Sequence, residues 1–297
     1  MSAAGRPSKL QDIEAVVSWV EPGMHVAFGG FLIHNKPMAF VRALARRATG
    51  SLHLYSCPTA SLDADMLVGA GLVQQTVLGN VSFDFLGAAP RFQSAVAADT
   101  IDAVLCDEAI VAGGYMATIE GIPYHPLASA RGHDVARHSK LLTPYRSHTG
   151  HDLVAVSPLQ PDIAVIHVQQ ADCYGNGRHL GGIWGDELIA KASKRVVLTA
   201  DEIVDEADIR SHPRATTISH HLVDAVVQVP FGAHPCASHG RYLFDEAHLR
   251  SYLAEAVTAE GFRSYMERFV NVDGHDGYLA ALGGIDKLSS LELRLPW

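Results

Sequence analysis

Short apolar runs alternate along the chain with stretches in which apolar residues recur every three or four positions. Residues 25–28 form the first such run and predict a strand that ends at two glycines. After Pro37, the apolar positions up to Arg46 fall on one face of a predicted helix. Residues 163–168 are almost continuously apolar, which is typical of a strand covered on both faces. Residues 245–269 predict one long or broken amphipathic helix.

The remaining segments follow the same alternation. Further strands are predicted at residues 52–55, 73–78, 101–105, 195–198 and 225–229, and further helices across residues 62–67, 89–97 and 184–192. Strands alternating with helices predict an α/β fold with an open, mostly parallel sheet and helices on both faces. No linker, repeat or low-complexity segment divides the chain, so we expect residues 1–297 to form a single domain. In open α/β sheets ligands bind beyond the carboxyl ends of the strands, so the loops after the strands hold the candidate site.

Composition narrows the function classes. The chain has 297 residues, 48% of them apolar, with 23 Lys+Arg against 32 Asp+Glu and a formal net charge of −9. This apolar content excludes global disorder, and the acidic balance argues against a nucleic-acid-binding protein. No apolar run reaches the roughly 18–20 residues that cross a bilayer, so no membrane association is expected, and we expect no secretory signal at the N-terminus. The four cysteines lie far apart without a CxxC pair, so we expect a reduced, cytoplasmic protein.

The first candidate loop follows the strand at residues 25–28. It contains Gly29, Gly30 and Phe31, and Asn35 lies further along the same loop. Two glycines let the backbone approach a ligand closely and leave N–H groups to donate to an oxyanion or a phosphate. The loop contains neither GxGxxG nor GxxxxGK[ST], so the sequence indicates neither a dinucleotide fingerprint nor a P-loop. A tight strand-to-helix turn also explains the glycines.

The second candidate loop follows the strand at residues 73–78 and contains Asn80 and Ser82. Both side chains are suited to hydrogen-bonding a substrate carboxylate. They are equally suited to capping the segment that follows, which is the common role of these residue types at loop ends. The residue types alone favour the cap.

The third candidate loop places two carboxylates, Asp107 and Glu108, after the strand at residues 101–105 and at the start of a predicted helix. A carboxylate there is stabilised by the helix dipole by roughly 0.3–1 kcal/mol, which is a sufficient structural reason for it. The end of a strand in an α/β sheet is also where a nucleophile or general base stands. We expect Asp107 to cap the helix and Glu108 to be the freer group.

Histidines and arginines gather between His125 and His151. They show no HExxH motif and no spacing of a closed zinc site, so we predict no metal site. Residues 123–150 are also rich in glycine and serine, and the sequence predicts a long loop there. Loops of that length in compact domains are often lids or partner surfaces, and this one is suited to an anionic ligand or an acidic neighbour.

Several separated segments of the chain form one recognisable set. The first is Gly-Met-His-Val-Ala-Phe-Gly-Gly-Phe from Gly23, followed by Pro37, and the second runs from Asp162 to Asn176. These segments resemble the signatures of family I coenzyme A transferase α subunits. Residues 204–205 and 223–235 look like the glutaconate CoA-transferase branch in particular. The segments occur in the family's order and span essentially the whole chain. One position departs, because the family signature usually has a glycine where Asn35 stands.

The resemblance implies an open α/β subunit of an obligate heteromer, α2β2 or higher, with coenzyme A as a substrate and no covalently bound cofactor. In these transferases the acyl-CoA thioester is attacked by a glutamate that belongs to the β subunit. CoA then moves to a carboxylic acid through enzyme-bound thioester and anhydride steps. This chain lacks the Glu-Asn-Gly segment that carries that glutamate, so a β subunit has to supply it. Gly29, Gly30 and Phe31 would lie beside the shared cleft, where N–H groups suit a thioester oxyanion.

Two alternatives stay open. Some relatives are CoA-thioester hydrolases that open a steroid ring with a glutamate of the α subunit in an Asp-Glu-Gly context. Asp107, Glu108 and Ala109 resemble that segment, with alanine in place of the glycine, and Glu108 would then act as the base. The other alternative, ranked lower, is a non-catalytic protein that binds acyl-CoA. We expect the transferase.

Overall fold

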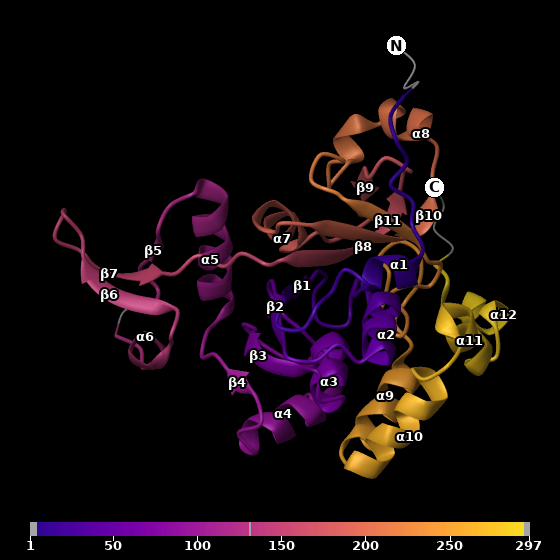
Figure 1. Ribbon diagram of the computed structural model, residues 1–297, viewed down its shortest axis with the longest axis horizontal. Helices are drawn as coiled ribbons and strands as arrows, with labels where there is room; N and C mark the ends of the chain where they lie inside the picture. Colours follow the sequence, from indigo (N-terminus) through magenta and orange to yellow (C-terminus); the bar gives the residue numbers. More distant parts are fainter. Residues whose placement is uncertain (1–4, 131, 294–297) are drawn as a thin grey trace.

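The fold is built on one large, mostly parallel sheet, and the computed structural model describes residues 5–130 and 132–293. The strand order is β11-β10-β8-β1-β2-β3-β4, every neighbouring pair is parallel, and a short β9 pairs antiparallel with β8 (Figure 1). The strands are β1 (His25–Phe28), β2 (Leu52–Ser56), β3 (Val73–Val77), β4 (Asp102–Ala103), β8 (Ile163–Ala171), β9 (Gly177–Arg178), β10 (Val196–Ile203) and β11 (Ala225–Gln228).

The helices connect these strands and form the C-terminal region. The longer ones are α2 (Met38–Arg47), α3 (Leu62–Gly69), α4 (Pro90–Ala97), α5 (Glu108–Glu120), α7 (Asp186–Ala192), α9 (Glu246–Ala256), α10 (Ala259–Phe269) and α11 (Gly274–Ala281). Shorter ones are α1 (Ile13–Val17), α8 (Glu206–Ser211) and α12 (Ile285–Leu288), with 3-10 turns η1 (Asp84–Leu86), η2 (Pro213–Ala215) and η3 (Ser289–Leu291). No helix within residues 5–130 and 132–293 is long and apolar enough to cross a bilayer.

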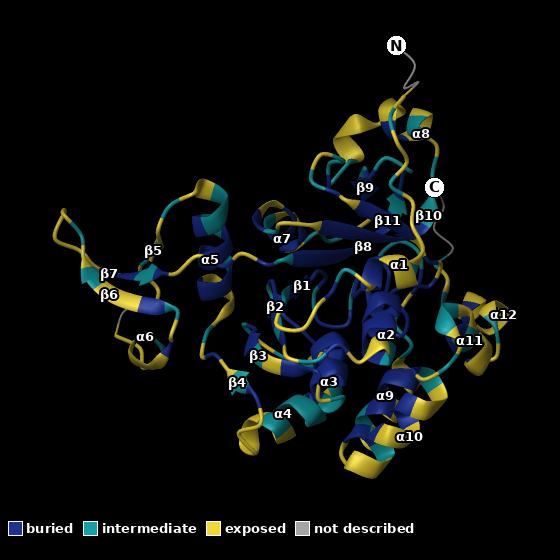
Figure 2. Cartoon of the chain, viewed as in Figure 1, coloured by how far each residue is buried: buried dark blue, intermediate teal, exposed yellow. Residues whose placement is uncertain are grey.

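Both faces of the sheet are buried, which confirms the predicted architecture. Along β1, Val26 and Phe28 pack into a core shared with α2, α3, α9 and α10, whereas Ala27 points to the opposite core with α5 and α7. Figure 2 shows the central strands and α2 almost entirely in the colour of buried residues. This two-sided burial explains why β8 is a near-continuous apolar run rather than an alternating one.

The strand order creates one switch point. From β1 the chain proceeds to β2, β3 and β4 on one side, and then returns to β8, β10 and β11 on the other. The loops that leave the carboxyl ends of β1 and β8 therefore run in opposite directions along the edge of the sheet. Open α/β sheets bind their ligands in the crevice between such loops.

The predicted elements are present with modest shifts of their ends. The strand expected at residues 101–105 is only two residues long, and the strands expected at 163–168 and 195–198 extend to Ala171 and Ile203. The helical region 245–269 is broken between Ala256 and Ala259, where the Thr258 side chain caps α10 by accepting from the Gly261 N–H.

The prediction of a long loop at residues 123–150 is wrong. That segment and the residues after it form a three-stranded antiparallel sheet of β5 (His125–Leu127), β7 (Asp152–Val156) and β6 (Leu142–Arg146), with the short helix α6 (Val135–His138). Figure 1 shows it projecting beyond α5, away from the large sheet. β5 and β6 are the edge strands and contain Pro126 and Pro144, which an edge tolerates but which hide a strand in the sequence pattern.

Candidate active site

The glycine loop continues β1 at the switch point of the sheet. The Gly29 N–H donates to the Val165 carbonyl at 2.9 Å, and the Phe31 N–H donates to the His34 carbonyl at 2.9 Å. Between them, the Gly30 N–H donates to Oδ1 of Asp186 at 2.7 Å. The three N–H groups that we expected to face an oxyanion therefore have partners inside the chain.

Asp186 is the buried anchor of this loop. Its second oxygen, Oδ2, lies 3.0 Å from Nε2 of His179, and the Nδ1 atom of that ring lies 2.7 Å from Oγ1 of Thr217. Both Asp186 and His179 are buried, and a Cβ atom at position 29 would lie 2.7 Å from Asp186 Oδ1. Gly29 is thus required by close packing against a carboxylate that the sequence pattern did not single out.

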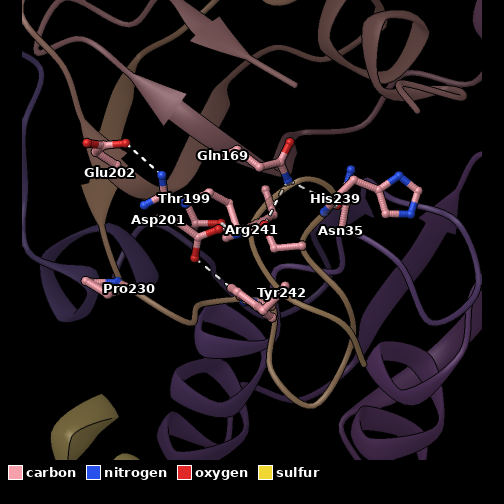
Figure 3. A network of polar contacts seen from close by, with 12 residues as sticks. Asn35, Gln169, Thr199, Asp201, Glu202, Pro230, His239, Arg241 and Tyr242 are labelled. Atoms are coloured by element: carbon pink, nitrogen blue, oxygen red, sulfur yellow. Dashed lines mark hydrogen bonds and ion pairs between the residues drawn. The ribbon is translucent and has the colours of Figure 1, made fainter. Parts of the chain in front are cut away.

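Asn35 belongs to the framework of the loop. Its backbone has a φ of 51°, in the left-handed region that glycine and asparagine adopt most readily, so the conformation suits asparagine as well as glycine. Its side chain is fully buried; Oδ1 accepts from Nε2 of Gln169 at 3.1 Å and from the His239 N–H at 3.0 Å (Figure 3). Nδ2 donates to the Gly182 carbonyl at 3.3 Å. The side chain is thus occupied by contacts within the chain, and a role of Asn35 toward the substrate stays a prediction.

A buried ion pair fastens the loop to the segment after β2. Lys36 Nζ lies 3.2 Å from Oδ2 of Asp63 and donates to the Thr59 carbonyl at 2.7 Å. Lys36 and Asp63 are at most 1% exposed, so each charge depends on the other for compensation. The loop after β1 is therefore held from two sides, by Asp186 and by this pair.

The two carboxylates at the start of α5 divide their roles as predicted. Asp107 caps the helix, because its Oδ1 accepts from the Ile110 N–H at 2.8 Å. Glu108 is exposed and makes no hydrogen bond or ion pair within the described part of the chain. Burial, followed by the nearby carboxylates of Asp186 and Glu108, raises the pKa of Cys57 to about 12. Glu108 is therefore close to the carboxyl end of β2, and its backbone abuts Gly79 at the end of β3.

Asn80 and Ser82 lie beside the segment that follows β2. The Ala60 N–H donates to the Asn80 carbonyl at 2.9 Å, and the Ser82 N–H donates to the Ala60 carbonyl at 3.1 Å. The capping interpretation is wrong, because η1 has Phe83 at its N-cap and no side chain caps it. Neither side chain has a hydrogen bond within the described residues, Asn80 is exposed, and a contact with substrate stays a prediction.

Sequence reasoning missed an aromatic wall at the same edge of the sheet, which we define as Phe31, His34, Trp184, His239 and Phe244. Trp184 stacks on Phe31 with 5.4 Å between ring centroids and contacts His239 edge-on at 5.0 Å. His34 lies between His239 and Phe244, at 4.9 and 6.3 Å. These residues come from three separate segments, so no local motif marks them.

A network of buried hydrogen bonds holds the segments that carry the residues of the aromatic wall. Gln169 Nε2 donates to Asn35 Oδ1 and to Oγ of Ser238, and the Ser238 hydroxyl donates to Asp201 at 2.5 Å. The Tyr242 hydroxyl also donates to Asp201, at 3.3 Å, as Figure 3 shows. These bonds fix the loop that carries His239. Among the described residues, no group of three or more His, Cys, Asp or Glu is arranged to hold a metal.

Comparisons with known proteins agree with this geometry. Residues 10–229 match the model of the Coenzyme A transferase family. The chain is 32% identical over 281 residues to an uncharacterized protein of Archaeoglobus fulgidus; the match covers 94% of this chain, which spans 63% of the length of that relative. It is 29% identical over 291 residues to one of the subunits of glutaconate CoA-transferase from Acidaminococcus fermentans, covering 91% of this chain and 90% of the relative.

Two further similarities bear on the alternatives. Over 280 residues the chain is 28% identical to the cholesterol ring-cleaving hydrolase IpdA subunit of Mycobacterium tuberculosis, covering 89% of this chain and 94% of the relative. The crystal structure of the Acidaminococcus fermentans glutaconate CoA-transferase superimposes with a TM-score of 0.92 at 28% identity, over 97% of this chain and 96% of that chain. The family model spans most of the chain, and the chain belongs to the coenzyme A transferase family.

Proposed function

We propose that the chain is the α subunit of a heteromeric enzyme that moves coenzyme A between an acyl-CoA and a carboxylic acid. The observation that carries the proposal is the similarity to glutaconate CoA-transferase over nearly the full length of both chains, in sequence and in structure. Transfer of coenzyme A needs a carboxylate that attacks the acyl-CoA thioester. We assign this nucleophile to a glutamate of a separate β subunit. Coenzyme A is a substrate in this scheme, and no cofactor is bound covalently.

Exposed apolar side chains at the carboxyl edge of the sheet are a second argument for a partner subunit. Five large apolar side chains in the loops there are between 36% and 63% exposed: Phe85, Leu105, Leu180, Trp184 and Leu243. Apolar groups gathered on one edge are typical of a surface that another protein or a ligand covers. A β subunit seated on this edge would bring its glutamate to the glycine loop and the aromatic wall. All four cysteines are free, which fits the cytoplasmic location that we assign to the enzyme.

A CoA-thioester hydrolase is the second candidate, and Glu108 favours it. This carboxylate is exposed at the carboxyl edge, has no partner within the described residues, and begins a helix whose cap is already supplied by Asp107. A free carboxylate in that position is suited to act as a general base on water.

The test is reconstitution with the co-purifying chain. The α chain alone and the complex are each incubated with acetyl-, butyryl- or glutaryl-CoA, with and without a second carboxylic acid. We expect the chain alone to be inactive, the complex to form the new acyl-CoA only with the acceptor acid, and hydroxylamine to trap a thioester on a glutamate of the partner. Release of free CoA without any acceptor, with no trapped thioester, would instead identify the hydrolase.

A further inference from the structure

A pocket of about 320 Å³ opens beside the aromatic wall and adjoins the glycine loop. Its described lining includes His34, Leu180, Ala237, His239, Leu243 and Phe244, and contains no lysine or arginine. Leu180 and Leu243 are among the exposed apolar residues of the carboxyl edge. The pocket is at the small end of the range for ligand sites and has an apolar lining with few polar groups, as such sites usually do.

The hydrogen bonds around the two histidines determine which nitrogens carry protons. The Gly182 N–H donates to Nδ1 of His239 at 3.3 Å, so that nitrogen is an acceptor. In a neutral ring the proton then resides on Nε2 of His239, which lies 3.1 Å from Nδ1 of His34 and donates to it. By the same logic the proton of His34 resides on Nε2. That N–H has no partner within the described residues.

Both rings are neutral at physiological pH. Burial, reinforced by the neighbouring His239, lowers the pKa of His34 to about 4, and burial also lowers the pKa of His239. His34 therefore offers one uncharged hydrogen-bond donor and no positive charge. A carboxylate placed against it would lose hydration without gaining an ion pair, which is costly in an apolar site.

The orientation of this donor is fixed by its surroundings. The backbone N–H of His239 donates to buried Asn35, and the His34 ring is held between His239 and Phe244. Trp184, which stacks on His34 and contacts His239 edge-on, has a φ of 48°, which is rare for a bulky aromatic residue. Backbone strain of this kind costs on the order of 1–3 kcal/mol and gathers at functional sites, so it is an independent sign that the wall is built for a ligand.

We propose that this pocket receives the acyl group of the thioester substrate, and that His34 Nε2–H donates a hydrogen bond to an uncharged oxygen of that group. The substrate class is therefore an acyl-CoA whose acyl part is apolar except for a keto or hydroxyl oxygen, rather than one that ends in a second carboxylate. This inference rests on the proposed function, because it assigns the specificity of the same site.

The test compares acyl donors of equal length on the complex with its partner. The donors are hexanoyl-, 3-oxohexanoyl-, 5-oxohexanoyl- and adipoyl-CoA, with acetate as acceptor and kcat/KM as the measurement. We expect at least one oxo donor to exceed hexanoyl-CoA by about 3- to 10-fold, the value of one neutral hydrogen bond, and adipoyl-CoA to be the poorest.

Variants identify the donor. His34→Phe keeps an aromatic ring and removes the N–H, so it should lower kcat/KM for the preferred oxo donor by about 3- to 10-fold more than kcat/KM for hexanoyl-CoA, which abolishes the preference. His34→Gln keeps an N–H donor and should retain part of the preference. His212→Phe, at an exposed position next to α8, is the matched control and should change neither.

The possible failures are distinguishable. A preference for adipoyl-CoA, or an equal loss on all four donors in His34→Phe, would overturn the inference while the transferase function stands. Absence of transfer from every donor by the wild-type complex would overturn the proposed function and this inference with it.

Discussion

The backbone N–H of Gly30 and the carboxylate of Asp186 are joined by a 2.7 Å hydrogen bond across 156 positions of sequence. This bond ties the loop after β1 to the first turn of α7, on the two sides of the switch point. Because the other carboxylate oxygen is held by His179, the carboxylate cannot turn away from the loop without losing that contact. The position of the glycine loop thus depends on one buried side chain.

Replacing that side chain should loosen the loop. Asp186→Asn keeps the shape but removes the charge, and its amide nitrogen cannot accept a hydrogen bond. We expect the free energy of unfolding, measured with urea, to fall by about 1.5–3 kcal/mol, the range for hydrogen bonds to charged groups. Transfer by the complex should fall as well. Glu187→Gln removes the neighbouring exposed carboxylate, which pairs with Lys191, and should cost less than about 1 kcal/mol; equal effects would contradict this role of Asp186.

Gly30 should not tolerate a side chain. Its φ is 79°, and a Cβ atom there would collide with the carbonyl oxygen of His34. We expect Gly30→Ala to lower the free energy of unfolding by more than about 1 kcal/mol and to displace the loop. Gly50→Ala is the control, because nothing lies within 4 Å of the added atom, and it should be neutral or slightly stabilising. Thermal melting of both variants tests this prediction, and equal melting temperatures of the two variants would contradict it.

Local pattern was sufficient for most of the fold and for part of the site. The strand β8 is predictable because burial on both faces requires a run of consecutive apolar residues. The turn after β1 is predictable because a positive φ, as at Gly30, favours glycine. Asp186 and His239 leave no such mark. Their roles arise from contacts with Gly30 and His34 across more than a hundred residues of chain, and an isolated Asp or His looks like any surface residue.

Glu108 distinguishes the two catalytic hypotheses. Glu108→Gln preserves length and removes the base, so a transferase whose nucleophile lies on the partner should keep its transfer rate within about 3-fold. A hydrolase that uses this carboxylate should lose about 100-fold or more, the usual contribution of general base catalysis. Glu120→Gln, at the opposite end of the same helix, controls for the change of charge. Steady-state rates of CoA transfer and of CoA release measure both reactions in one assay.

Buried titratable groups also connect the loop after β11 with α11 and connect α9 with α10. His234 lies 2.7 Å from the Tyr278 hydroxyl and 3.3 Å from Asp245, and His248 lies 2.7 Å from the Tyr265 hydroxyl. Burial is the main cause that lowers the pKa of His234, and it lowers the pKa of His248 to about 3. Both rings therefore stay neutral in the folded protein at pH values where an exposed histidine takes up a proton.

These histidines should make the fold sensitive to mild acid. The unfolded chain binds protons near pH 6.5 and the folded chain does not, so the stabilising contribution is complete above pH 6.5 and declines as the pH falls toward 3, by up to about 1.4 kcal/mol per pH unit for each ring. Asp65 acts in the opposite direction, because burial raises its pKa to about 6 and the folded protein binds that proton first. Burial also lowers the pKa values of His34, His239 and His275, so the histidines outnumber this carboxyl group. Urea unfolding at pH 7.5, 6.5, 5.5 and 4.5 should therefore show a net loss of stability below pH 6.5. His248→Gln should make this pH dependence shallower by about one proton, whereas His212→Gln on the surface should leave it unchanged. A free energy of unfolding that stays constant from pH 6.5 to 4.5 in the wild type would show that these rings are not buried in the neutral form.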